Sequence, residues 1–232
     1  MEDQSLVRSA KTVEEAIELA TLELGVGRDE IEIDVISQGR SGILGIGSED
    51  ARVRVRRITG GDGSAAAALG IVERFLDWMD VDAVATIRSS GNGEEMPVID
   101  IQGSDAGLLI GHRGETLRAF QFLVNLSLGR AEGRSMGIVL DVEQYRERRS
   151  RQLAALARRM AQRAISSGRS VELDPMSPAD RRVIHFTLAD FQGVETQSEG
   201  EGADRRVVII TTGEAPRPSR GGRGDGRRRS RS

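Results

Sequence analysis

Along residues 1–57 the spacing of the apolar positions changes between two periods, and each change marks a new secondary-structure element. In residues 13–24 the apolar side chains recur about every 3.6 residues, which predicts a helix. The pair Thr12 and Glu15 forms a capping box at its start, and Gly25 is expected to end it. One strand is expected before this helix and two after it. The segment therefore predicts the order strand, helix, strand, strand.

The two later strands are predicted because residues 31–36 and 51–57, IEIDVI and ARVRVRR, alternate with period two. Between them, residues 39–47 read GRSGILGIG. Four glycines in this stretch indicate a tight, shaped loop. Its apolar residues either bind a partner or fold back onto the core of the same domain. Residues 58–66, ITGGDGSAA, have the composition of a flexible linker.

A second domain is predicted over residues 67–143. The patterns indicate a helix at 67–79, strands at 83–88 and 97–101, a helix, a turn with two glycines, a helix at 115–128 and a strand at 137–142. The expected element order is α-β-β-α-α-β.

A third domain is predicted over residues 144–212. It begins with a long helix, residues 144–167, whose apolar residues form one stripe and whose arginines fall largely on the other side. Ser177 caps a short second helix that has Pro178 in its first turn, and a hairpin follows. Residues 213–232 lack periodicity and are expected to be a disordered tail rich in arginine and glycine. The predicted fold class is α+β, with three small α/β-layer domains and a basic tail.

Composition excludes several classes of function. The sequence has no cysteine and two histidines far apart in the chain, so we expect neither a thiol nucleophile nor a metal site. No catalytic residue and no cofactor is predicted. No apolar run reaches the length of a membrane span, and the first residues, MEDQSLVRSAK, do not resemble a signal peptide. These features predict a cytoplasmic protein without a membrane span.

Charge is distributed unevenly along the chain, whose net charge is −3. Residues 58–143 contain six basic and thirteen acidic residues, whereas residues 144–212 contain twelve basic and nine acidic ones. The tail adds seven arginines, including Arg-Gly-Gly-Arg at 220–223. The third domain and the tail are therefore the segments whose charge suits a polyanion.

The stretch GLLIGHRGETLRAF, residues 107–120, places two glycines around His112 and Arg113 where one helix ends and another begins. Absent side chains would let a sugar-phosphate backbone approach the main-chain amides, and the start of the second helix favours anions. An ordinary turn between two helices is the alternative interpretation. The candidate RNA-binding residues of this turn are Ile110, Gly111, His112, Arg113, Gly114 and Arg118.

With the order α-β-β-α-α-β around it, this turn resembles the GXXG loop of the KH domain in its type II, bacterial form. The resemblance implies that the turn clamps a few nucleotides of single-stranded RNA, or of single-stranded DNA as the alternative. Because residues 58–143 are acidic, a KH domain that mainly mediates dimerisation is the alternative interpretation.

A second candidate site lies in the short helix, where Arg181 and His185 are four residues apart and share one flank. By spacing alone, a solvated helix face is an equally simple interpretation. The surrounding sequence, MSPADRRVIHFTLAD followed by SEGEGADRRVVII, resembles the R-three-H domain, a module that binds single-stranded nucleic acid. The residues expected to bind RNA here are Arg181, Arg182, His185, Arg205 and Arg206.

Taken in order, the N-terminal domain with its GRSGILGIG loop, the KH domain and the R-three-H domain resemble the bacterial Jag family. The resemblance implies a non-catalytic RNA-binding regulator linked to cell-envelope growth and division. It also implies a second small KH protein, or self-association, as the protein partner. The alternative is an interaction adaptor in which only the third domain touches nucleic acid. A nuclease that uses His185 is disfavoured, because no acid/base partner is evident.

Overall fold

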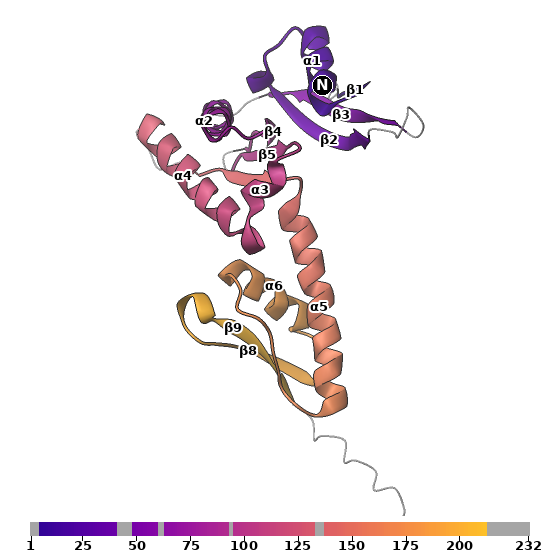
Figure 1. The fold of residues 1–232 in the computed structure, drawn as a ribbon, viewed down its shortest axis with the longest axis vertical. Helices are drawn as coiled ribbons and strands as arrows, with labels where there is room; N and C mark the ends of the chain where they lie inside the picture. Colours follow the sequence, from indigo (N-terminus) through magenta and orange to yellow (C-terminus); the bar gives the residue numbers. More distant parts are fainter. Residues whose placement is uncertain (1–4, 41–47, 60–62, 93–94, 133–136, 213–232) are drawn as a thin grey trace, which may run out of the picture. The chain divides into compact units, whose positions relative to one another are not determined.

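The computed structural model describes residues 5–40, 48–59, 63–92, 95–132 and 137–212 (Figure 1). It divides into two compact units, Met1–Arg146 and Glu147–Ser232. Within the described residues, six α-helices and three three-stranded sheets confirm the predicted α+β class. Most of the GRSGILGIG loop and the whole predicted tail lie outside the described residues.

Helix α1, Val13–Leu24, begins and ends where the sequence predicts. The Thr12 hydroxyl accepts a hydrogen bond from the Glu15 amide at 3.1 Å, and Gly25 ends the helix at φ 63°. That left-handed conformation costs glycine little. The Glu15 carboxylate accepts from the Lys11 amide rather than from that of Thr12, so this half of the predicted capping box is shifted by one residue.

The first sheet has the order β1-β3-β2 and is antiparallel throughout. The alternation in the central strand is confirmed, because Ala51, Val53 and Val55 are fully buried while the arginines between them are exposed. Its elements are β1 (Leu6–Ala10), α1, a 3-10 turn (Arg28–Glu30), β2 (Ile31–Arg40) and β3 (Glu49–Arg57).

The middle region of the first unit follows the predicted order α-β-β-α-α-β. Its sheet has the order β4-β5-β6, with an antiparallel first pair and a parallel second pair. Helices α2 and α4 pack on one face of this sheet around a largely aliphatic core that also contains Phe120. The elements are α2 (Ser64–Met79), β4 (Val84–Ser89), β5 (Val98–Gln102), α3 (Ala106–Ile110), a 3-10 turn (His112–Gly114), α4 (Glu115–Glu132) and β6 (Val139–Val142).

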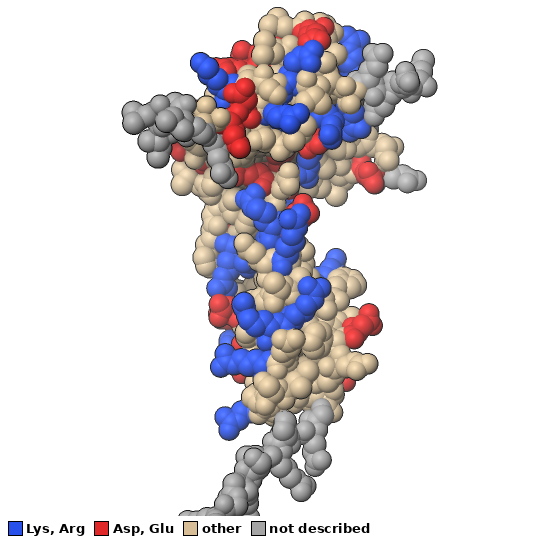
Figure 2. All heavy atoms as spheres, turned by 90° about the vertical axis from the view of Figure 1, so that its right-hand side faces the viewer, with Lys and Arg blue, Asp and Glu red and all other residues tan. Residues whose placement is uncertain are grey.

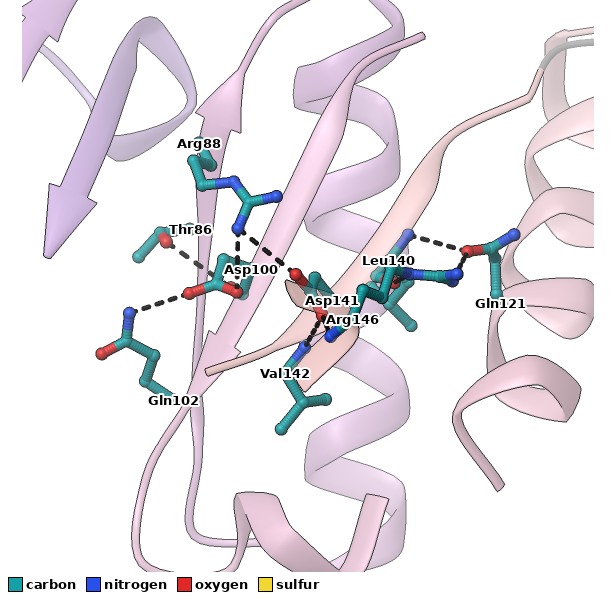
Figure 3. Close-up of polar contacts among 9 residues, drawn as sticks. All are labelled: Thr86, Arg88, Asp100, Gln102, Gln121, Leu140, Asp141, Val142 and Arg146. Carbon is teal, nitrogen blue, oxygen red and sulfur yellow. Dashed lines mark hydrogen bonds and ion pairs between the residues drawn. The ribbon is translucent and has the colours of Figure 1, made fainter. Parts of the chain in front are cut away.

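The opposite face of this sheet carries a buried polar network (Figure 3). Asp100 on β5 and Asp141 on β6 lie side by side in register and are both almost fully buried. The Arg88 guanidinium lies 3.3 Å from the Asp141 carboxylate and 3.8 Å from that of Asp100. Burial is the largest influence on Asp100 and raises its pKa above the ordinary value. One guanidinium therefore faces two neighbouring carboxyl groups.

Two predicted boundaries move in the structure. The last three residues of the predicted linker, which spans residues 58–66, belong to α2, because this helix begins at Ser64. Ser64 and Ala65 are both buried. Hydrogen bonds outside the linker also tie the first two sheets together, since the Glu32 carboxylate accepts from the Ser90 amide (2.7 Å) and hydroxyl (2.8 Å). A glycine-rich composition alone does not reveal such contacts.

The second boundary, predicted after residue 143, falls after Arg146 in the division into compact units. Arg146 donates to the Leu140 carbonyl at 3.1 Å and to the Gln121 side chain at 2.6 Å (Figure 3). Tyr145 packs against the core of the middle region. The first turn of the long helix therefore bonds to the sheet β4-β5-β6 and to α4.

The second unit places a three-stranded antiparallel sheet, with the order β7-β9-β8, against two helices. Its core joins Leu153 and Ala157 of α5 to Ile184 of α6 and to Val207 and Ile209 of β9. The elements are α5 (Tyr145–Ser167), β7 (Val171–Glu172), α6 (Pro178–Leu188), β8 (Val194–Glu199), a 3-10 turn (Gly202–Asp204) and β9 (Arg206–Thr211). No helix in the described ranges has both the length and the apolar character needed to cross a membrane.

Candidate nucleic-acid interface

The glycine turn between α3 and α4 has an unusual backbone. Gly111, Arg113 and Gly114 all have positive φ, of 65°, 53° and 80°. Glycine adopts such values freely, whereas Arg113 does so at a cost. The first amide of α4, on Glu115, already donates to the His112 carbonyl. The turn is therefore tight, and the Glu115 amide already has a hydrogen-bond acceptor within it.

The space beside the two glycines is filled by the protein itself. A Cβ atom on Gly111 would overlap the Thr116 hydroxyl, and one on Gly114 would lie 2.9 Å from the Tyr145 ring. Packing and backbone conformation therefore require glycine at both positions. The sequence-based argument, that the missing side chains leave room for a sugar-phosphate chain, is corrected here: at these Cβ positions Thr116 and Tyr145 occupy that room.

What the turn presents to solvent is a smaller set of groups. His112 and Arg118 are exposed, Arg113 is half-buried, and Gly114 is buried. Ile110 is partly buried and packs against the core, so it supports the turn. The exposed side chain of Leu108 lies in the preceding helix. An incoming nucleic acid would meet two cationic side chains, one histidine and an apolar residue at this turn.

Helix α6 is fixed at its start by a cap and by a partly buried ion pair. Ser177 accepts a hydrogen bond from the Asp180 amide at 3.1 Å, and Pro178 is the first helical residue, as predicted. The Asp180 carboxylate is turned to the Arg149 guanidinium of α5, at 3.0 Å and 3.3 Å, rather than back to the cap. Two helices of the second unit are therefore held together beside the candidate residues.

His185 is bound on both sides of its ring. Its Nδ1 lies 2.7 Å from the Thr196 hydroxyl and its Nε2 lies 2.9 Å from the Ser198 hydroxyl, both on β8. Burial, and then the nearby charge of Arg181, lower the pKa of His185 below its ordinary value. The ring is therefore neutral at pH 7 and joins α6 to β8. This geometry differs from the expected one, in which His185 donates to a phosphate or stacks on a base.

The two arginines before His185 have different environments. Arg181 is partly buried, and its Nε has no hydrogen-bond partner in the described part of the chain. Arg182 is exposed. Four residues after Arg182, and therefore on the same side of the helix, the ring of Phe186 is 75% exposed. Sequence reasoning missed Phe186, although its position one turn from an arginine was a readable signal.

Of the two arginines at the start of β9, only Arg205 lies near α6. Its carbonyl accepts from the amide of Met176, just before the helix. Arg206 lies on the sheet face away from the core, because Val207 and Ile209 point inward. There it pairs with the Glu172 carboxylate at 3.3 Å. The expectation that Arg206 extends the α6 surface is therefore not met, because the strand alternation turns it to the other face.

The described residues contain no group of three or more histidine, cysteine, aspartate or glutamate residues that could hold a metal ion. The candidate residues belong to the two compact units separately: the glycine turn to the first and the α6 residues to the second. We define the α6 surface as Arg181, Arg182 and Phe186.

Comparisons with known proteins match the N-terminal and C-terminal parts of the chain to two family models. The model of the Jag N-terminus matches residues 8–57, and the model of the R-three-H domain matches residues 151–211. RNA-binding protein KhpB of Clostridium symbiosum is 37% identical over 201 residues, covering 87% of this chain and 89% of the relative. RNA-binding protein KhpB of Bacillus subtilis is 33% identical over 210 residues, covering 89% and 98%.

The chain carries a Jag N-terminus and an R-three-H domain, and it matches these relatives over most of its length. These matches define the family of the protein. The chain belongs to the Jag family, to which the KhpB proteins also belong. The family resemblance stated from the sequence is confirmed.

Proposed function

We propose that this protein is a non-catalytic regulator that binds single-stranded RNA, with the α6 surface as the principal contact. The observation that carries the proposal is the exposed pair Arg182 and Phe186 on the helix that bears the Arg-xxx-His motif. The relatives that cover most of the chain are named RNA-binding proteins, which supports the nature of the ligand.

Each group of the α6 surface has a distinct task in this proposal. The Arg182 guanidinium pairs with a phosphate through two parallel hydrogen bonds. The exposed Phe186 ring offers a face on which a base stacks, a contact worth about 1–3 kcal/mol and tolerant of base identity. Arg181 adds positive charge one turn before His185. His185 positions α6 against β8 and does not itself contact the RNA.

The contacts of His185 support binding without cleavage. A general acid or base needs a proton position that is free to exchange with substrate. Both ring nitrogens of His185 instead meet hydroxyls of β8 at hydrogen-bond distance. We therefore expect the RNA to be released intact.

The glycine turn is the second contact of the proposal. His112, Arg113 and Arg118 provide the local positive charge of an otherwise acidic region, and the turn begins helix α4. Phosphates are favoured at such a helix start. The contribution of the turn is expected to be smaller than that of the α6 surface, because Gly111 and Gly114 leave no vacant space at their Cβ positions.

The α6 surface is tested by titrating the full chain with a labelled single-stranded oligoribonucleotide. Phe186→Leu, which keeps an apolar side chain but removes the aromatic face, should weaken binding by roughly tenfold. Phe186→Tyr should restore most of the affinity. Trp78→Leu is a matched control, since Trp78 is an equally exposed aromatic, at 76%, in the other unit. Unchanged affinity for both Phe186→Leu and Arg182→Gln, with the fold intact, would remove α6 from the site.

The family resemblance extends the proposal to biology. We propose that RNA binding regulates cell-envelope growth and division and that a second small KH protein, or another copy of this chain, is the protein partner. The wild-type gene should then restore normal cell shape to a deletion strain, whereas Phe186→Leu combined with Arg182→Gln should not. Full rescue by this binding-deficient double variant would separate the shape phenotype from RNA binding.

One observation favours the alternative role as an interaction adaptor. Helix α4 exposes Phe122, Leu123 and Leu126, with 66%, 46% and 43% of each side chain accessible. Such an apolar helix face suits a protein partner better than a phosphate chain. Cross-linking to RNA followed by mass spectrometry discriminates the roles. Cross-links near Gly111 and Gly114 support RNA binding by both units, whereas a map confined to residues 144–232 supports the adaptor.

A further inference from the structure

Helix α5 carries a second positively charged surface that the Arg-xxx-His motif does not include. Figure 2 shows arginine side chains gathered along this helix. We define the α5 arginine face by its exposed members within the second unit, which are Arg148, Arg151, Arg158, Arg159 and Arg163. These residues lie opposite Leu153, Ala157 and Ala161, which are buried in the core.

Acidic residues do not neutralise the later part of this face, from Arg158 to Arg163, within the helix. From residue 148 to residue 171 the sequence contains no aspartate or glutamate. Arg151 pairs with Glu147 at the start of the helix. Arg158, Arg159 and Arg163 make no ion pair with any carboxylate of the described residues. Arg159 and Arg163 are four residues apart, where like charges repel each other.

Acidic residues of the same unit gather elsewhere. Glu195 and Glu199 alternate along β8 with residues that face α6, and Glu172 lies beside β9. All three are exposed. Part of the unit's acidic charge therefore lies on the outer face of the sheet, where Glu172 pairs with Arg206, whereas α5 carries only positive charge from residue 148 onward. A helix that served only solubility would gain stability from glutamates among its arginines, and α5 has none along this stretch.

We propose that the α5 arginine face binds the phosphate backbone of the RNA, independently of base identity. This inference rests on the proposed function and adds a second contact surface to it. The face runs from Arg148 to Arg163, about 22 Å at 1.5 Å per residue, which allows contact with several successive phosphates. Arginine pairs well with phosphate because its planar guanidinium donates two parallel hydrogen bonds.

A nucleic-acid backbone fits this face better than an anionic membrane surface does. A helix that lies on a membrane inserts an apolar face beside its basic one. The apolar face of α5 is instead occupied by the core of its own unit, through Leu153, Ala157, Ala161 and Ala164. What remains exposed is mainly charged or polar, with Ile165 as an exception near the end of the helix.

The test compares two triple variants of the full chain. Arg158→Gln, Arg159→Gln and Arg163→Gln together remove three charges from α5 while keeping good helix formers. The matched control removes three exposed arginines from the first unit, through Arg52→Gln, Arg54→Gln and Arg74→Gln. Both are titrated with a labelled uridine oligoribonucleotide over a range of salt concentrations, and circular dichroism checks that the helix content is kept.

We expect the α5 variant to bind the oligoribonucleotide at least about tenfold more weakly at moderate salt. The slope of log K against log salt should fall in magnitude by about 2, because each lost phosphate contact on a single strand removes about 0.7. The control should keep most of the wild-type slope. An α5 variant with the slope of the control would overturn the inference. So would an unchanged RNA titration accompanied by loss of binding to vesicles containing phosphatidylglycerol, which would indicate a membrane surface.

Failure of the inference and failure of the proposed function remain distinguishable in this design. If the wild-type chain does not bind the oligonucleotide, the proposed function is wrong. If the wild-type chain binds, Phe186→Leu weakens it and the α5 variant behaves as the control, only the α5 inference is wrong.

Discussion

His185 bridges helix α6 and strand β8, because each ring nitrogen meets a hydroxyl at 2.7 Å or 2.9 Å. A neutral imidazole donates through one nitrogen and accepts through the other. Protonation would make both nitrogens donors, and the neighbouring Arg181 would oppose the added charge. The histidine of the Arg-xxx-His motif thus stabilises the surface on which Arg182 and Phe186 are displayed.

This role predicts a pH dependence of stability. The pKa of His185 is lowered in the folded state, so the unfolded chain binds the proton more readily. The stabilisation is therefore present above pH 6.5 and is lost as the pH falls through that value and then through the folded pKa. At pH 7.5 His185→Ala should lower the free energy of unfolding by about 1–2 kcal/mol, from two lost hydrogen bonds.

Chemical denaturation at a series of pH values measures this effect. The difference between wild type and His185→Ala should shrink as the pH is lowered from about 7.5 to about 5. Phe186→Ala is the matched control, because its exposed ring contributes little to stability and does not titrate. A difference that stays constant with pH would contradict the assignment of His185 as a neutral bridge.

At the scale of elements, the sheet β4-β5-β6 places the carboxyl groups of Asp100 and Asp141 in register, and the two contribute differently to stability. Asp141 accepts hydrogen bonds from the Val142 amide at 3.0 Å and the Arg146 amide at 3.3 Å, and it pairs with Arg88. Asp100 accepts from the Gln102 side chain and lies farther from Arg88. Asp141 therefore ties the sheet to the start of α5, whereas burial of the charged Asp100 is costly.

We expect replacement of Asp141 and of Asp100 by asparagine to have different effects on the free energy of unfolding. Asp141→Asn should destabilise the first unit by about 1–3 kcal/mol, because the charge of the carboxylate that accepts these hydrogen bonds and pairs with Arg88 is lost. Asp100→Asn should be neutral or stabilising at pH 7, because the raised pKa means that ionisation of Asp100 opposes folding as the pH rises. Denaturation at pH 4 and pH 7 checks both. Equal losses for the two variants would contradict the unequal roles.

In the glycine turn, the effect of side-chain charge on RNA affinity can be measured without changing the fold. Replacing both His112 and Arg113 by aspartate should keep the fold, because aspartate tolerates the left-handed backbone of position 113 and is favourable at a helix start. It should weaken RNA binding several-fold by repelling phosphate. The neutral control is asparagine at both positions, which should lie in between. Unchanged affinity of the folded aspartate variant would exclude the turn from the interface.

The elements themselves were largely readable from the sequence, because caps and periodicity are local properties. Thr12, Gly25 and Ser177 begin or end helices where predicted. The side-chain partners were not readable, since they depend on which elements meet. Nothing near His185 in the sequence reveals Thr196 and Ser198, and nothing near Gly114 in the sequence reveals Tyr145. Phe186 differs from these partners, because its spacing from Arg182 could have indicated the shared side of the helix, whereas the exposure of its ring is a property of the folded unit.

At the scale of the whole molecule, the charge and the binding residues are divided between the two compact units. The first unit contributes an acidic KH-like region with a few cationic side chains at its glycine turn. The second contributes the α6 surface and the α5 arginine face. The family relationship extends over both units, from the Jag N-terminus to the R-three-H domain. These features support our proposal that the chain binds RNA without cleaving it.

The most direct test of this claim is a titration of the purified full chain with a labelled single-stranded oligoribonucleotide, followed by electrophoresis of the recovered RNA. The account predicts saturable binding that strengthens as salt is lowered, together with RNA of unchanged length after prolonged incubation. Absence of binding even at low salt, or recovery of shortened RNA, would contradict it.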